Sequence, residues 1–289
     1  MLACVHIHEA PMLFSLNYSP EMAALIRSGD IEVDRIKCPE WPDMIAEAST
    51  VGQVYVHFKL MAGQGLLARE LLDSVARFRQ ETATPYVNTH IGPSSALYPL
   101  PSDRSGAKDA VRRSFDQLSE QFGPDAVIAE NVPYPARSDN DKSLISIDPE
   151  FISEVIEESG VGLLLDIGHA RRVAEHWGID PRIYMSRLPV HRLREIHITG
   201  LGYSPEGMRV DHMPMRDEDW DLLGWALDNV QSGNWAEPWS VSCEYGGVGE
   251  PFRWRSRADV IAHDAPRMLA MVRAAQPAVT PQTKPTGEA

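Results

Sequence analysis

The sequence lacks the features of a secreted, membrane-spanning or nucleic-acid-binding protein. Its 289 residues include three cysteines, Cys4, Cys38 and Cys243, without Cys-x-x-Cys spacing, which excludes a disulfide framework and fits a reducing compartment. No apolar run approaches the roughly 18 residues of a membrane helix, and the first residues lack the basic start of a signal peptide. Basic residues are scarce, because 27 Lys and Arg face 41 Asp and Glu, and the net charge of −14 repels nucleic acid and anionic membrane. We therefore predict a cytoplasmic protein with no nucleic-acid or membrane partner.

Motifs of the common nucleotide-binding folds are absent as well, whereas strands and helices alternate along the chain. Neither G-x-G-x-x-G nor G-x-x-x-x-G-K-[ST] follows an expected strand. Apolar, β-rich runs predict eight strands, at residues 2–8, 32–37, 53–59, 85–91, 126–132, 161–167, 193–199 and 239–245. Capped or amphipathic segments predict helices at 19–29, 65–81, 107–123, 148–160, 217–230 and 258–275. This alternation predicts an α/β protein, a single (β/α)8 TIM barrel over residues 1–275, with a disordered tail at 276–289.

Polar side chains stand at the carboxyl ends of consecutive expected strands. The apolar strand in "GVGLLLDIGHA" (160–170) ends in Asp166, and His169 follows one helical turn later. Such groups beside apolar bulk cost on the order of several kcal/mol to desolvate unless a partner satisfies them. In a barrel the strand ends meet at one rim, where TIM-barrel enzymes keep their chemistry. The set comprises His57, His90, Glu130, Asp166, His169, His197, Asp211, His212 and Glu244.

A metal centre explains why so many imidazoles and carboxylates share one rim. As bare groups the carboxylates would repel one another. Bound cations neutralise them, and neutral imidazoles supply further donors. Because the donors outnumber what one ion requires, we predict two or three ions with bridging carboxylates. Glu130, Asp166 and Glu244 are the expected catalytic groups.

Each of these residues taken alone has an ordinary structural explanation. Glu130 could cap a helix, and Glu244 could pair with an arginine. Only the joint pattern across six consecutive βα units favours the metal centre. The other histidines are assigned structural roles, with His8 left open because it ends the first expected strand; they are His6, His8, His176, His191 and His263.

Four further residues near the rim are candidates for substrate contact. Lys37 and Lys59 could bind a carboxylate or phosphate, or simply face solvent. Asn88 and Asn131 stand beside expected ligands and could bind substrate or orient those ligands.

The order of these residues resembles a known superfamily. His, His, Glu, Asp-x-x-His, His, Asp/His and Glu along a TIM barrel are similar to the xylose isomerase-like superfamily, including the endonuclease IV metal site. The segments "AENVPYP", "LLLDIGHARRVAEHWGIDPRIY", "RLREIHITGLG", "RDEDWDLL" and "CEYGG" resemble the multinuclear non-heme iron-dependent oxidative enzymes, which include methanobactin-type oxazolone synthases. The likeness covers roughly residues 50–250.

This resemblance implies two or three iron ions (Fe2+/Fe3+) held by the nine residues above. It also implies that dioxygen is used to modify a cysteine or similar residue of a ribosomally synthesised precursor peptide. A small peptide-recognition partner protein often presents that peptide. The sequence departs from the family where Asp211 and His212 are adjacent rather than spaced Asp-x-His, and where His169 replaces a frequent Asn. Because adjacent residues rarely both face one ion, we expect His212 to matter more than Asp211.

Other functions remain open from the sequence. The principal alternative is a sugar or sugar-phosphate isomerase or epimerase, in which Mn2+, Mg2+ or Zn2+ acts with Glu130 and Glu244 to move a proton beside a carbonyl. An endonuclease IV-like phosphodiesterase is disfavoured by the acidic surface. A metal-binding barrel without catalytic activity is the alternative from another class.

Overall fold

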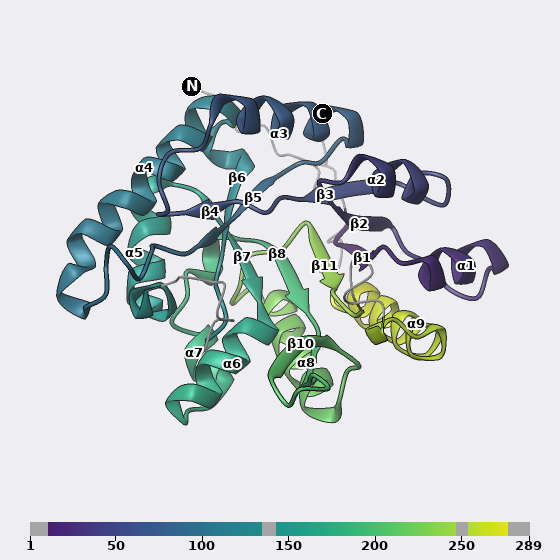
Figure 1. The fold of residues 1–289 in the computed structure, drawn as a ribbon. Helices are drawn as coiled ribbons and strands as arrows, with labels where there is room; N and C mark the ends of the chain where they lie inside the picture. The colour runs from purple at the N-terminus through teal and green to yellow at the C-terminus, as the bar shows by residue number, and fades with distance from the viewer. Residues whose placement is uncertain (1–10, 135–142, 247–253, 277–289) are drawn as a thin grey trace, which may run out of the picture.

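The computed structural model describes residues 11–134, 143–246 and 254–276. Its centre is a curled, nine-stranded sheet in which all pairings are parallel, in the order β3-β2-β1-β11-β8-β7-β6-β5-β4. Helices surround the sheet on its outside (Figure 1). The strands are β1 (Leu13–Asn17), β2 (Arg35–Pro39), β3 (Val54–His57), β4 (Met61–Ala62), β5 (Val87–Ile91), β6 (Val127–Glu130), β7 (Gly162–Asp166), β8 (Leu193–Ile198) and β11 (Ser240–Cys243).

The two ends of this sheet are consecutive parts of one stretch of chain. Only three residues, 58–60, separate β3 from β4. Asn88 in β5 accepts a hydrogen bond from the Phe58 N–H at 2.7 Å and donates one to the Phe58 carbonyl at 3.0 Å. The His90 N–H donates to the Leu60 carbonyl at 3.0 Å. The ring of strands therefore closes through 54–62, and the prediction of a TIM barrel is confirmed.

The helices begin and end where their sequence signals lie. Ser19 caps α1 by accepting the Met22 N–H, and Asp148 caps α5 by accepting the Glu150 N–H. Gly29 and Gly160 end these two helices in the left-handed conformation. The helices are α1 (Pro20–Ser28), α2 (Pro42–Ala48), α3 (Arg69–Thr82), α4 (Arg104–Phe122), α5 (Pro149–Ser159), α6 (Ile167–Trp177), α7 (Pro181–Met185), α8 (Asp217–Gln231) and α9 (Ala258–Ala274).

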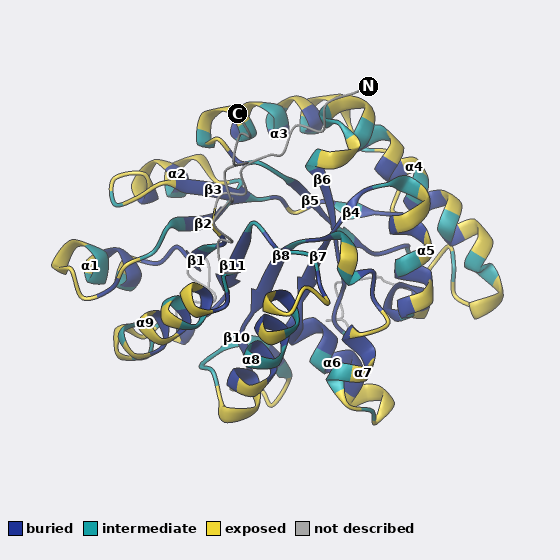
Figure 2. Cartoon of the chain, turned by 180° about the vertical axis from the view of Figure 1, so that it is seen from behind, coloured by how far each residue is buried: buried dark blue, intermediate teal, exposed yellow. Residues whose placement is uncertain are grey.

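The hydrophobic core lies between the sheet and these helices. Every residue of β6 and β7 is buried, and the buried sides of the helices face the strands while their outer sides are exposed (Figure 2). Strands covered on both faces read as continuous apolar runs, which is why the sequence identified them. None of the helices in the described part of the chain is long and apolar enough to cross a membrane.

The structure corrects several expectations about the elements. The expected first strand, 2–8, lies outside the described residues, and the first strand that the structure describes is β1. Phe14, Ser15 and Leu16 of β1 are buried. Because the polar Ser15 interrupts the apolar run, the sequence did not predict this strand. The sequence did not predict helices α2, α6 and α7. It also did not predict the hairpin formed by β9 (Gly200–Tyr203) and β10 (Arg209–Met213). Of the expected tail, 276–289, only Gln276 is described.

Candidate metal centre

The predicted ligands meet at one end of the barrel because each lies at or near the carboxyl end of a strand. Glu130 ends β6 and Asp166 ends β7. The strand register sets His90 beside Glu130 across β5 and β6, and Asp166 beside His197 across β7 and β8. The other members are His57 at the end of β3, His169 in α6, Asp211 and His212 in β10, and Glu244 directly after β11.

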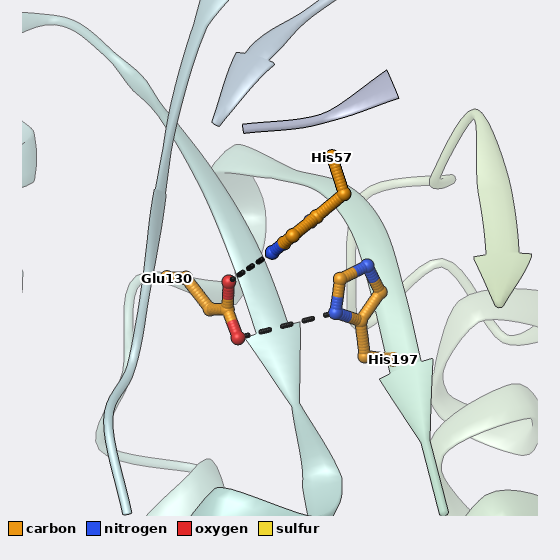
Figure 3. A group of neighbouring side chains, drawn as sticks. All are labelled: His57, Glu130 and His197. Atoms are coloured by element: carbon orange, nitrogen blue, oxygen red, sulfur yellow. Dashed lines mark ion pairs between the residues drawn. The ribbon is translucent and has the colours of Figure 1, made fainter. Parts of the chain in front are cut away.

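Glu130 lies at the centre of this group. Its Oε2 is 3.6 Å from Nε2 of His57 and 3.2 Å from Nε2 of His90. Its Oε1 is 3.4 Å from Nδ1 of His169 and 3.9 Å from Nδ1 of His197. Figure 3 shows His57 and His197 pointing at different oxygens of the carboxylate. Glu130 thus directs Oε2 at His57 and His90 and Oε1 at His197, an arrangement that would suit a carboxylate shared between two ions.

Asp166 joins β7 to α6 without a loop. Its Oδ1 accepts the N–H of His169 at 2.7 Å and so caps the helix. Its Oδ2 is buried and has no hydrogen-bond partner among the described residues. Burial, followed by the charges of Glu244 and Glu130, raises the pKa of Asp166 well above its usual value. A bound cation would give the buried Oδ2 a partner and would reduce the repulsion between Asp166 and the other two carboxylates.

Glu244 is the best-compensated carboxylate of the centre. Lys37 donates a charge-assisted hydrogen bond to its Oε1, and Nδ1 of His197 lies 3.2 Å from the same oxygen. Burial alone would raise the pKa of Glu244, but Lys37 and His197 outweigh it and hold this pKa well below its usual value. Burial, Lys37 and His197 also lower the pKa of His57, which keeps its imidazole neutral, as a metal ligand must be.

The β9–β10 hairpin turns two adjacent side chains toward the centre. The register shifts between Val210 and Met213, and His212 has a φ of 59°. As a result the usual alternation is interrupted. Asp211 Oδ2 lies 3.7 Å from Nε2 of His169, and His212 Nε2 lies 3.9 Å from Oε2 of Glu244. Both Asp211 and His212 therefore lie beside the centre, although neither belongs to a group of three ligand atoms within 4.8 Å of one another, and the greater importance of His212 stays a prediction.

Main-chain carbonyl groups orient two of the imidazoles. Nδ1 of His90 is 3.2 Å from the Leu60 carbonyl, and Nδ1 of His169 is 2.9 Å from the Asn131 carbonyl. A hydrogen bond of this kind at one ring nitrogen fixes which nitrogen is protonated and leaves the other for a metal.

The two asparagines lie against ligands. Asn88 Nδ2 is 3.1 Å from Nε2 of His57, besides its two bonds to Phe58. The side chain of Asn131 exchanges hydrogen bonds with the backbone N–H and C=O of Asp166, at 2.8 and 2.9 Å. Both asparagines are buried, and these contacts support a positioning role.

Sequence reasoning missed a buried polar layer beneath the centre. Glu195 Oε1 lies 2.9 Å from Nε2 of His197 and accepts the Tyr55 hydroxyl at 2.8 Å. The Ser15 hydroxyl lies within 3.2 Å of the Tyr55 hydroxyl and 2.9 Å of the Ser240 hydroxyl. The signal was present in "REIHIT", where Glu195 and His197 share one face of an otherwise apolar strand.

The other residues singled out in the sequence make other contacts or lie outside the described residues. Lys59 is exposed, and its backbone N–H donates to Glu40. Cys243 is buried, which raises the pKa of its thiol to about 12, as expected for a core residue. His6 and His8 lie outside the described residues. The remaining histidines have other partners. His176 packs against Tyr134, His191 pairs with Glu157, and His263 pairs with Asp264.

The donor set fits metal binding. Three groups have ligand atoms within 4.8 Å of one another: His57, Glu130 and His197; Glu130, Asp166 and His169; and Asp166, His197 and Glu244. The groups share members, so carboxylates at their intersections can bridge ions. Mixed imidazole and carboxylate donors suit iron, manganese and zinc.

The fold and the centre define a class: a TIM barrel with candidate metal-ligand residues clustered at its carboxyl rim. Residues 37–235 match the family described as RiPP precursor modification enzyme MbnB/TglH/ChrH, where RiPP denotes a ribosomally synthesised and post-translationally modified peptide. This match covers more than half of the chain. The chain belongs to this family of enzymes.

Curated relatives are similar over part of their length. A UPF0276 protein of Alcanivorax borkumensis is 28% identical over 186 residues, which are 60% of this chain and 60% of that protein. A UPF0276 protein of Pseudomonas aeruginosa strain UCBPP-PA14 is 27% identical over 57% of this chain and 59% of its own. A third, from Anaeromyxobacter, is 29% identical over 36% of this chain and 35% of its own. The chain thus spans between about a third and three fifths of these relatives.

Solved structures share the fold. A xylose isomerase domain protein from Alicyclobacillus acidocaldarius has a TM-score of 0.57 at 15% identity, with 91% of this chain and 99% of that chain covered. The probable 3-DHS dehydratase AsbF of Bacillus anthracis has a TM-score of 0.56 at 13% identity, with 89% and 98% covered. At such identities the likeness establishes the architecture, and function has to be argued from the site.

Proposed function

We propose that this protein is a multinuclear iron-dependent enzyme that uses dioxygen to oxidise a residue, Cys or similar, of a ribosomally synthesised precursor peptide. The observation that carries the proposal is Glu130, whose two oxygens face the imidazoles of His57 on β3 and His197 on β8. Combined with the family membership, this arrangement supports a centre of two or three iron ions. Dioxygen and the precursor peptide would be its substrates, and a small recognition protein would be its partner.

The residues of the chain would bind and orient these components. The four carboxylates of the centre would balance the charge of the ions. The contacts of the His90 and His169 rings with main-chain carbonyl groups hold those rings in place. When bound, ferrous iron supplies the capacity to bind and reduce dioxygen.

One side of the centre remains accessible to a substrate. The exposed side-chain fractions are 19% for His57, 17% for His90 and 27% for His212, whereas His197 is fully buried. A peptide thiolate or carboxylate could reach the ions from this side and be oriented by binding them.

The pairing of Glu244 with Lys37 disfavours Glu244 as the base of the isomerase alternative. A base that moves a proton beside a carbonyl needs a pKa near the working pH. Lys37 and His197 overcome the effect of burial and hold the pKa of Glu244 well below its usual value, so this carboxylate is a weak base.

The function is tested with protein loaded with iron under anaerobic conditions. We expect oxygen consumption only when a short Cys- or Asp-containing peptide encoded beside the gene is added, and a mass change at one residue of that peptide. Asp166→Asn should abolish both signals, whereas the distant His263→Ala should not change them. Turnover of an aldose or ketose under nitrogen, with Mn2+ or Mg2+ in place of iron, would replace this proposal with the isomerase.

A further inference from the structure

Lys37 lies buried inside the centre, whereas a lysine that binds substrate at the rim would be accessible to solvent. It lies in the middle of β2, in register with Asn17 and Tyr55, and is 3% exposed. Its ammonium group donates to Glu244 Oε1 and lies 3.3 and 3.1 Å from the two ring nitrogens of His197. A cation of the chain itself therefore already contacts two of the predicted metal ligands.

The three donor groups are not equivalent in this respect. The group of Glu130, Asp166 and His169 contains no residue that Lys37 contacts. In the group of His57, Glu130 and His197, Lys37 contacts only His197. In the third group, Asp166, His197 and Glu244, two of the three members contact the ammonium. The space that an ion would take between His197 and Glu244 is thus filled by Lys37.

Building on the proposed metal centre, we propose that the centre holds two metal ions and that the ammonium group of Lys37 takes the place of a third. Glu130 would be among the residues that hold these ions. Lys37 would then be a positioning residue that sets the number of ions and holds Glu244 against His197.

The charges of the centre disfavour a third ion. Four carboxylates surround it, namely Glu130, Asp166, Asp211 and Glu244, and Lys37 and Arg172 already neutralise part of their charge. One divalent ion balances what remains and two already exceed it, so a third would add further uncompensated positive charge. A third ion would face both the ammonium group and the other ions at short range in a buried site, where repulsion is poorly screened.

Lys37 also lacks an easy route out of the site. A surface lysine can swing away to admit an ion, because its long stem has many rotamers. Lys37 instead starts from a central strand and is enclosed by β1 and β3 on either side. An ion that displaced Lys37 would have to break its hydrogen bond to Glu244. The ammonium group could not then reach solvent to replace that bond.

The experiment counts metal ions. Wild-type protein, Lys37→Ala and Lys37→Gln are loaded with ferrous iron anaerobically, freed of excess metal, and analysed for iron per chain by elemental analysis. Lys108→Ala serves as the matched control, because Lys108 pairs with Glu158 on the helical surface away from the centre. Circular dichroism verifies that each variant is folded.

We expect two ions per chain in the wild type and in Lys108→Ala, and three in Lys37→Ala and Lys37→Gln. Three ions in the wild type would overturn the role of Lys37 while leaving the iron centre standing. One ion or none in the wild type would overturn the multinuclear centre and this inference together. Folded Lys37 variants that retain only two ions would show that Lys37 does not set the count, and the wild-type count tests the two-ion centre even if the variants do not fold.

Discussion

At the scale of single residues, Asp166 performs two tasks with its two oxygens. Oδ1 caps α6 and Oδ2 faces the centre. The position therefore couples a local helix signal to the predicted chemistry, and the two tasks can be separated by substitution.

Asp166→Asn should preserve the cap and abolish metal binding, because Asn caps helices about as well as Asp but carries no charge. Asp166→Ala should lose the cap as well and unfold with a free energy about 1 kcal/mol below that of Asp166→Asn. Chemical denaturation of the metal-free proteins measures this difference. Ser19→Ala is the control, since it removes the cap of α1 and should cost a similar amount without loss of metal. Equal stability of the two Asp166 variants would show that the cap contributes nothing.

The raised pKa of Asp166 predicts how the stability of the metal-free protein depends on pH. The folded state retains this proton at pH values where the unfolded carboxyl, with a pKa of about 3.9, has lost it. The free energy of unfolding should therefore fall as the pH rises above about 4, up to the folded pKa. Asp166→Asn should remove this contribution and show a smaller decrease over the same interval. Parallel pH profiles for the two proteins would contradict the burial and repulsion inferred for Asp166.

At the scale of elements, the β9–β10 hairpin decides whether Asp211 and His212 reach the centre. Arg255 donates to the Asp211 carbonyl at 2.7 Å, and Arg172 lies 3.6 Å from the Asp211 carboxylate. Gly200 permits the hairpin to lie close, since a Cβ there would stand 1.9 Å from the Pro214 carbonyl oxygen.

Gly200→Ala should displace the hairpin and weaken metal binding at least tenfold, while the barrel remains folded. The reason is that the clash is with backbone, which cannot move aside as a side chain can. Isothermal titration with Mn2+ gives the affinity. Gly207→Ala, at the hairpin turn, meets nothing within 4 Å and has only its φ of +80° to oppose it, so it should leave the affinity within about twofold. Unchanged affinity in Gly200→Ala would remove the hairpin from the centre.

At the scale of the whole molecule, the centre ties together strands that are far apart in the sequence. Its candidate ligands lie in or directly after β3, β5, β6, β7, β8, β10 and β11, so bound ions would join most of the barrel. Metal binding and folding should therefore be linked.

Removal of metal by a chelator should lower the melting temperature by several degrees or more, because ligand at 1,000 times its dissociation constant stabilises the folded state by about 4 kcal/mol. Differential scanning calorimetry before and after chelation measures the shift. The Glu130→Gln variant, which lacks the bridging charge, should melt at the same temperature with and without chelator. A wild-type melting temperature that ignores chelation would mean that no preformed centre exists.

The sequence by itself determined the alternation of strands and helices, the helix caps and the set of candidate ligands. These features are local: hydrophobic period, capping residues and polar residues at strand ends are readable within a few turns of chain. It did not determine β1, because Ser15 interrupts the apolar run, or the direct passage from β7 into α6, because Asp166 serves both elements.

Only the tertiary structure decided which of these residues meet and how. The contact of Lys37 with Glu244 spans 207 positions, and the layer of Tyr55 and Glu195 spans 140, so no local pattern encodes either. The two inward side chains of Asp211 and His212 depend on a bulge held by distant arginines. The candidate ligands could thus be identified from local sequence, whereas charge compensation and orientation arise only when the barrel brings distant strands into register.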